Sequence, residues 1–206
     1  MTRPGCEPEP VPPHYARLGR YIAQLPEGLA SFPECEAKAS VHRRVVDYSG
    51  LALTGLPPEL QRLIDEPPTH STWIPQCQSL ALLLATLDAV NLDQEAEVKW
   101  IRKASTHVFS SPMYRILMWA ATPRTLFKGA HMRWSAFFRG SNLEAEVGDG
   151  QAYITLCSPE ALFTRDLAGV FENVLAAATN FTEEGDGSLA LDEYVPGAIR
   201  YRGAWR

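Results

Sequence analysis

The sequence has few cysteines, and none lies in a pattern that binds a metal. The four cysteines form no CxxC pair and have no histidine at a zinc-site spacing. Structural zinc sites need closely spaced Cys and His ligands, and disulfide frameworks are typical of small secreted domains. We therefore expect reduced, mostly buried thiols, with no bound metal and no cofactor.

Long hydrophobic runs and an excess of basic residues are also missing. The longest apolar run, Leu80 to Leu87, is far too short to span a bilayer, which predicts no membrane insertion. Pro and Glu at positions 7–10 stand where a secretory signal would need an apolar stretch, so we expect a cytoplasmic location. A formal charge of -5 argues against nucleic acid as a partner.

No stretch of the chain carries a catalytic signature. Cys157 is the best candidate nucleophile, because it is predicted at a strand end before a helix N-terminus, where the helix dipole can lower a thiol pKa. Neither a Gly-rich elbow nor a linked histidine accompanies it. A small hydrolase or cyclase that uses Cys157 or His131 is the enzymatic alternative, and the sequence favours a protein that is not an enzyme.

The first 128 residues read as a tail followed by helices. Residues 1–13 contain five prolines and little that could bury surface, which predicts a disordered tail before a single domain over 14–206. Tyr15, Leu18, Ile22 and Leu25 form a helical stripe that Pro26 ends. Further helices are predicted over 38–46, 77–87 and 95–107, the last of them capped by Asp93. Three more are predicted to open at Pro57-Pro58, at Ser111-Pro112 and at Thr122-Pro123.

Residues 129–206 are predicted to form the sheet part of the domain. Period-two alternation predicts strands over 131–138 and 143–147, with 152–157 as a third short strand or part of a bent ribbon. A hairpin is predicted for 189–195 and 199–205. Ser158 and Pro159 are typical of a helix start, and the helix would run to about Asn180. The expected fold is α+β, a helical N-terminal half followed by a ββαββ antiparallel unit.

Aromatic residues suggest where a ligand could bind. Several lie in segments that should face one another across the boundary between helices and sheet, where they could line an apolar pocket or serve as plain core. The candidate ligand-binding residues are Trp100, Tyr114, Trp119, Trp134, Tyr153 and Cys157.

Charged residues on the predicted strands form a second feature. Arginines could converge on one outer sheet face, and the expected partners for them are Glu144 and Glu146. The arginines in question are Arg133, Arg139, Arg200, Arg202 and Arg206.

Short motifs spread over the chain resemble an uncharacterised protein family that is expanded in myxobacteria. They are Ala37-Lys38-Ala39-Ser40, Trp73-Ile74-Pro75, Ser111-Pro112-Met113-Tyr114, Thr122-Pro123-Arg124, Trp134 with Phe138-Arg139-Gly140-Ser141, and Arg202-Gly203-Ala204-Trp205. The element order also resembles the wider superfamily of haem-nitric-oxide-binding sensors, vinyl-reductase-type ligand-binding domains and vesicle-tethering subunits. That resemblance implies a small sheet with covering helices around a ligand pocket, or a surface used for assembly.

The haem sensors in this superfamily hold their cofactor with a Tyr-x-Ser-x-Arg motif. Here Tyr153 is followed by Ile154, Thr155, Leu156 and Cys157, so the motif is missing, and His107 is the histidine that precedes the sheet on a predicted helix. We therefore expect a colourless sensory or regulatory module that binds a small apolar or amphipathic molecule, or a protein partner. The alternative without a ligand is an adaptor that forms a homodimer through its helices.

Overall fold

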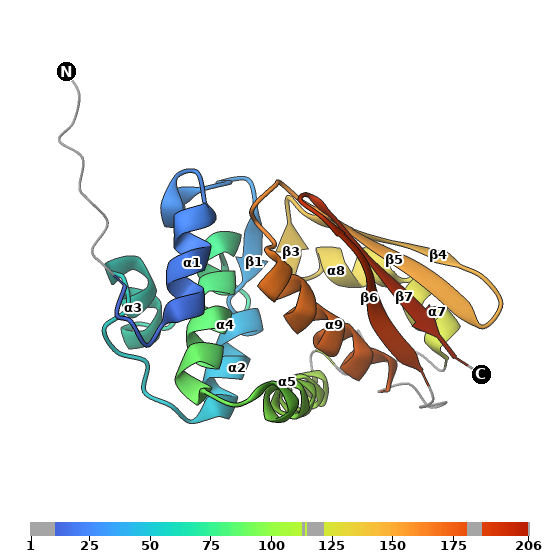
Figure 1. Ribbon diagram of the computed structural model, residues 1–206, viewed down its shortest axis with the longest axis horizontal. Coiled ribbons are helices and arrows are strands. Elements are labelled where there is room, and N and C mark those ends of the chain that lie inside the picture. The colour runs from blue at the N-terminus through green and yellow to red at the C-terminus, as the bar shows by residue number, and fades with distance from the viewer. Residues whose placement is uncertain (1–10, 113, 115–121, 181–186, 206) are drawn as a thin grey trace, which may run out of the picture.

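The computed structural model describes residues 11–112, 114, 122–180 and 187–205. Helices form one side of the molecule and a four-stranded sheet forms the other (Figure 1). The N-terminal elements are α1 (Ala16–Gln24), η1 (Gly28–Ala30), β1 (Glu36–Lys38), α2 (Ser40–Ser49), α3 (Pro58–Asp65), β2 (Trp73–Pro75), α4 (Gln76–Val90) and α5 (Gln94–Phe109). They are followed by α7 (Pro123–Lys128), α8 (Ala130–Ser135), β3 (Phe138–Arg139), β4 (Asn142–Val147), β5 (Gln151–Cys157), α9 (Arg165–Thr179), β6 (Ser188–Val195) and β7 (Ala198–Ala204).

The α+β fold is confirmed, and α4 lies at the centre of the helical half. Its residues from Gln76 to Leu87 are buried with one partly accessible exception, which explains why the apolar run has no polar face. Near the C-terminal end of α4, the Asp88 carboxylate accepts hydrogen bonds from the backbone amides of Arg17 and Leu18. These bonds satisfy free donors in the first turn of α1. No helix within the described ranges is long and apolar enough to cross a membrane.

Side-chain caps fix the starts of three helices. The Asp93 carboxylate accepts from the Ala96 amide at α5, and the Thr122 hydroxyl accepts from the Thr125 amide at α7, as their positions before Glu-rich and Pro-led segments predicted. The Thr164 hydroxyl does the same for α9. These caps set where each helix begins around the interior.

We expect Asp93→Ala to lower the free energy of unfolding by about 1 kcal/mol, because the exposed cap of α5 loses its acceptor. Urea denaturation measures the change. Asp93→Asn keeps a capping oxygen and should lose much less. Equal losses in the two variants would show that the cap is not what matters at this position.

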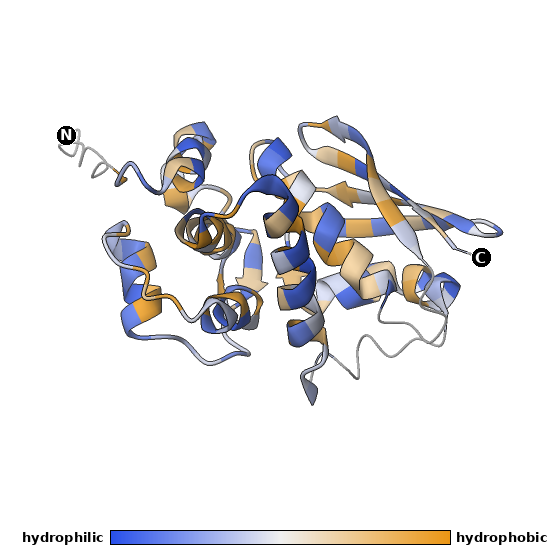
Figure 2. Ribbon diagram, turned by 60° about the horizontal axis from the view of Figure 1, so that its bottom comes forward, coloured by the Kyte–Doolittle hydropathy of each residue, from blue (hydrophilic) through white to orange (hydrophobic). Residues whose placement is uncertain are grey.

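The larger sheet is antiparallel, with strand order β4-β5-β7-β6. Alternate residues of its inner face, such as Leu143, Ile154 and Tyr201, are buried under α7, α8 and α9. Hydrophobic residues accordingly concentrate between the helices and the strands (Figure 2). The opposite face carries exposed or half-exposed side chains.

A second, smaller sheet has the order β2-β1-β3. Ala37 of β1 pairs with Ile74 on one side and Phe138 on the other. Its strands come from both halves of the chain. It therefore ties the segment before the larger sheet to the helical half.

The predicted strand over 131–138 is wrong. Residues 130–135 form α8, and only Phe138 and Arg139 are extended, in the small sheet. The buried positions Ala130, Trp134 and Phe137 have the four- and three-residue spacing of a helix. The ββαββ unit is therefore β4, β5, α9, β6 and β7, with the third short strand predicted over 152–157 as its second member.

Two predicted helix starts are also displaced. Ser158 does not cap a helix, because its hydroxyl donates to the Pro159 carbonyl and a turn follows, with Ala161 at a positive φ of 66°. The helix begins after Thr164 instead. At the other end of the chain, residues 36–38 form β1, so the helix predicted from Lys38 starts at Ser40.

Residues 1–10 of the predicted tail and most of the helix predicted from Ser111 lie outside the described residues. Val11, at the end of that tail, is half-buried and packs against the core.

Candidate functional site

An apolar cavity of about 180 Å³ lies between the helical half and the larger sheet. Its wall comes from α2, α4 and α5 on one side and from α7, α8 and α9 on the other, with Leu143 of β4 and Ile154 of β5 as its floor. Each of these elements turns apolar side chains toward the same space. The cavity is the space left where helices and sheet converge.

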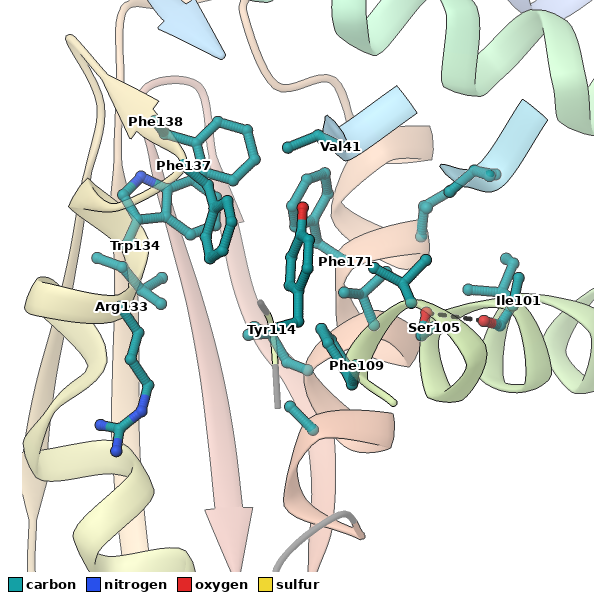
Figure 3. A pocket seen from close by; sticks show the side chains of 18 of the residues that line it. Val41, Ile101, Ser105, Phe109, Tyr114, Arg133, Trp134, Phe137, Phe138 and Phe171 are labelled. Carbon is teal, nitrogen blue, oxygen red and sulfur yellow. Dashed lines mark hydrogen bonds between the residues drawn. The ribbon is translucent and has the colours of Figure 1, made fainter. Parts of the chain in front are cut away.

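Aromatic rings form much of this wall, and Figure 3 shows how they face one another. Tyr114 stands between Phe109 of α5 and Phe137, and it stacks on the Phe137 ring with a centroid distance of 4.3 Å and an interplanar angle of 6°. Trp134 stacks on Phe138 at 4.1 Å. Interlocked rings of this kind hold their positions, so the wall is preformed.

The two hydroxyls and the guanidinium on the wall are bound to other protein atoms. The Ser105 hydroxyl donates to the Ile101 carbonyl, and the Tyr114 and Ser40 hydroxyls hydrogen-bond each other. The Arg133 side chain runs toward α7 and donates to the Leu126 carbonyl (Figure 3). Burial raises the pKa of Tyr114 to about 12, so this hydroxyl keeps its proton at neutral pH.

Three of the candidate ligand-binding residues lie together on this wall. Trp100, Tyr114 and Trp134 all line the cavity. Tyr153 and Cys157 do not, because the inner face of β5 is formed by Ala152, Ile154 and Leu156 and they point the other way. Trp119 lies outside the described residues.

Sequence reasoning missed several aromatic residues of the wall. Phe137 and Phe138 lie in the segment predicted as a strand over 131–138, and Phe171 lies on the helix predicted to run to Asn180, but none of the three was among the candidate ligand-binding residues. Phe127 packs against Gly203, whose lack of a side chain leaves room for the ring. The four-residue spacing of Ala130 and Trp134 was the signal that could have placed this segment on a helix facing the cavity.

Cys157 and His131, the candidate nucleophile and base, both lack the surroundings that catalysis would need. Burial and the nearby Glu144 carboxylate raise the pKa of the Cys157 thiol, and the helix predicted to start directly after it begins only at Arg165. His131 is exposed and contacts the Asn142 side-chain oxygen. His107, the candidate haem ligand, is exposed on α5 and lies beside the Tyr48 ring, away from the cavity.

A second, polar cleft of about 260 Å³ lies beside the start of α9. Two of its three arginines are already paired, Arg20 with Asp166 at 3.1 Å and Arg17 with Glu97 at 2.8 Å. The third, Arg165, has its guanidinium 5.8 Å from the centre of the Tyr194 ring. In the described part of the chain, no group of three or more His, Cys, Asp or Glu residues could hold a metal ion.

The arginines do not converge on one face as expected, nor do they pair with Glu144 and Glu146. Arg139 pairs with Glu36 at 3.0 Å in the small sheet. Arg200 pairs with Asp192 at 2.8 Å and with Glu193 at 3.4 Å across the β6–β7 hairpin. Only Arg200 and Arg202 lie on the outer face of the larger sheet, and Arg206 is outside the described residues.

No protein-family model matches the chain, and no curated protein matches it. The resemblance drawn from short motifs therefore stays a prediction, and the cavity itself carries the functional argument.

Proposed function

We propose that the protein is a sensory or regulatory module that binds a small apolar molecule in the cavity between its helices and its sheet. The observation that carries this proposal is the aromatic wall around a cavity of about 180 Å³. In the described part of the chain, the free thiols of Cys35, Cys77 and Cys157 support a reducing, cytoplasmic location.

The size of the cavity favours a ligand with one ring or a short branched chain. An engineered apolar cavity of about 150 Å³ in another protein stays dry and binds benzene. A cavity slightly larger than that, at 180 Å³, accepts a molecule such as toluene. Because the wall hydroxyls of Ser105 and Tyr114 are already bonded, a polar ligand group placed deep inside would lose its hydrogen bonds to water.

We expect toluene to stabilise the protein, by about 1.4 kcal/mol when its concentration is about ten times the dissociation constant. Isothermal titration calorimetry gives that constant, and urea denaturation with and without toluene gives the stabilisation. Phenol should bind at least several-fold more weakly, because burying an unpaired hydroxyl costs about 1–3 kcal/mol.

Ala104→Leu tests the location of the bound toluene. Ala104 is buried on α5 and lines the cavity, so added carbon atoms would occupy the space and should weaken toluene binding at least tenfold. Ala96→Leu is the matched control, since Ala96 lies on the same helix outside the cavity wall. Undiminished binding in Ala104→Leu, or no response of the wild type to toluene, contradicts the proposal.

Native mass spectrometry of protein purified from its host separates this proposal from the adaptor alternative. A retained small molecule in the native complex supports ligand binding. A clean mass of the chain alone, together with a stable dimer, supports an adaptor or assembly subunit without a ligand. The same spectrum reports both properties, so it decides between the two readings.

A further inference from the structure

The outer face of the larger sheet carries two rows of opposite charge. Exposed Glu144 and Glu146 lie on β4, and exposed Arg200 and Arg202 lie on β7. Between them β5 presents Tyr153 and Thr155, both half-buried. We call these six residues the outer sheet face. The described helices that contact this sheet lie against its other side (Figure 1).

The strand register places the charges at matching levels. Glu144 is opposite Thr155, which is opposite Arg200, and Glu146 is opposite Tyr153, which is opposite Arg202. Two strand spacings separate each glutamate from the arginine at its level, about 10 Å. Among the described residues no ion pair joins a glutamate of β4 to an arginine of β7, so the two rows are not directly paired within one copy.

The ion pairs that do form leave part of this face uncompensated. Arg200 is held by Asp192 and Glu193 of β6, and its guanidinium lies 5.5 Å from the centre of the Tyr153 ring. Among the described residues, neither Glu146 nor Arg202 forms an ion pair. One acid and one base at the same level therefore remain available to an external partner.

We propose that a second copy of this chain docks on the outer sheet face, with the two-fold axis running along β5. Rotation about that axis lays β4 of each copy over β7 of the other while keeping every residue at its level. Glu146 then meets Arg202 of the second copy, and Glu144 meets Arg200 of the second copy. The same contact occurs twice, as a two-fold interface requires.

The alternative two-fold arrangement of these faces is disfavoured by charge. An axis across the strands would lay β4 on β4 and β7 on β7, which brings Glu144 and Glu146 close to their own copies. Like charges at such distances repel, so the register selects the axis along β5. This interface is on the opposite side of the sheet from the cavity, and it does not depend on a bound ligand.

The dimer formed this way is weak and sensitive to salt. Three overlapping strands at about 4.8 Å spacing and about 20 Å length cover an area on the order of 300 Å² per copy, against about 800 Å² for a stable interface. The Debye length is about 8 Å at physiological ionic strength, so added salt weakens the attraction between exposed charges across the interface. We therefore expect the dimer to form at low salt and high protein concentration.

Charge reversal with complementation tests the proposal by sedimentation velocity at low salt. The wild type should show a concentration-dependent dimer that salt disperses. Glu146→Arg and Arg202→Glu should each weaken self-association at least about tenfold, because each places like charges opposite one another twice. Mixing the two variants should restore a dimer of about wild-type affinity, since both cross-contacts then join opposite charges.

Two further measurements keep the outcome unambiguous. Lys103→Glu, an exposed reversal on α5, is the control and should associate like the wild type. Circular dichroism shows that each variant is folded before it is centrifuged. A wild type that stays monomeric at every concentration, a dimer unaffected by both reversals, or a mixture that does not associate would each overturn the proposal.

Discussion

Replacing Gly140 by alanine is expected to lower the free energy of unfolding by about 2–5 kcal/mol. Gly140 has a φ of +74°, and a Cβ atom there would lie 2.6 Å from the Cys35 Sγ, 2.7 Å from the Glu34 carbonyl oxygen and 2.8 Å from the Cys35 Cα. The strained dihedral costs about 1–2 kcal/mol, and the contact with backbone atoms adds about 1–3 kcal/mol. Urea denaturation measures the loss.

Gly50→Ala is the control for this experiment. Gly50 ends α2 at a similar φ of +65°, but nothing lies within 4 Å of the position of its added Cβ. Only the dihedral cost of about 1–2 kcal/mol should appear there. Equal losses of unfolding free energy at the two glycines would show that Gly140 is not tightly packed against Glu34 and Cys35.

Acidification should destabilise the protein through His42, by about 3 kcal/mol between about pH 7 and pH 4. Burial, with a contribution from Arg43 and His70, lowers the pKa of His42 from 6.5 to about 4. Its Nδ1 atom lies 3.4 Å from the Ser79 hydroxyl, and its Nε2 atom is buried without a hydrogen-bond partner among the described residues.

The sign follows from where the proton binds. The unfolded chain takes up a proton on His42 near pH 6.5, whereas the folded protein resists it until about pH 4. Stability is therefore complete above about pH 6.5 and falls as the pH drops toward 4. Burial also lowers the pKa of His70, which adds to the loss in the same direction.

The measurement is the slope of unfolding free energy against pH. His42→Leu and His42→Gln remove the titrating group, so both should flatten the slope whatever their stability at pH 7. His107→Leu replaces an exposed histidine on α5 and should leave the slope as in the wild type. A wild-type slope retained in both His42 variants would assign the acid sensitivity to other groups.

Local signals in the sequence predicted the features that depend on neighbouring residues. Asp93 and Thr122 act as caps because the amide that each one binds lies three residues further along the chain. Ser158 has the same local signature, yet its segment turns to bury Leu162 and Phe163 and delays the helix to Thr164. Tertiary packing decided between two equally acceptable starts.

The candidate site was predictable only in part, for a related reason. Trp100 and Trp134 were placed correctly at the boundary between helices and sheet. Tyr153 was not, because both faces of β5 carry apolar or aromatic side chains, and the alternation does not say which face the helices cover. Short apolar segments such as 130–138 fit both the strand and the helix period, and the contacts that choose between them are distant in sequence.

The small sheet also bears on how a molecule would reach the cavity. Its central strand β1 is held by β2 on one side and by β3 on the other, so it bridges the two walls that enclose the cavity. A hinge motion that swung those walls apart would have to break the pairing of β1 with β3, because β1 and β2 both lead into helices of one wall and β3 follows α8 of the other. For the ligand binding proposed above, we therefore expect uptake and release to proceed by local movements of side chains and helix ends, so the rate of exchange would report these fluctuations and not an opening of the whole molecule.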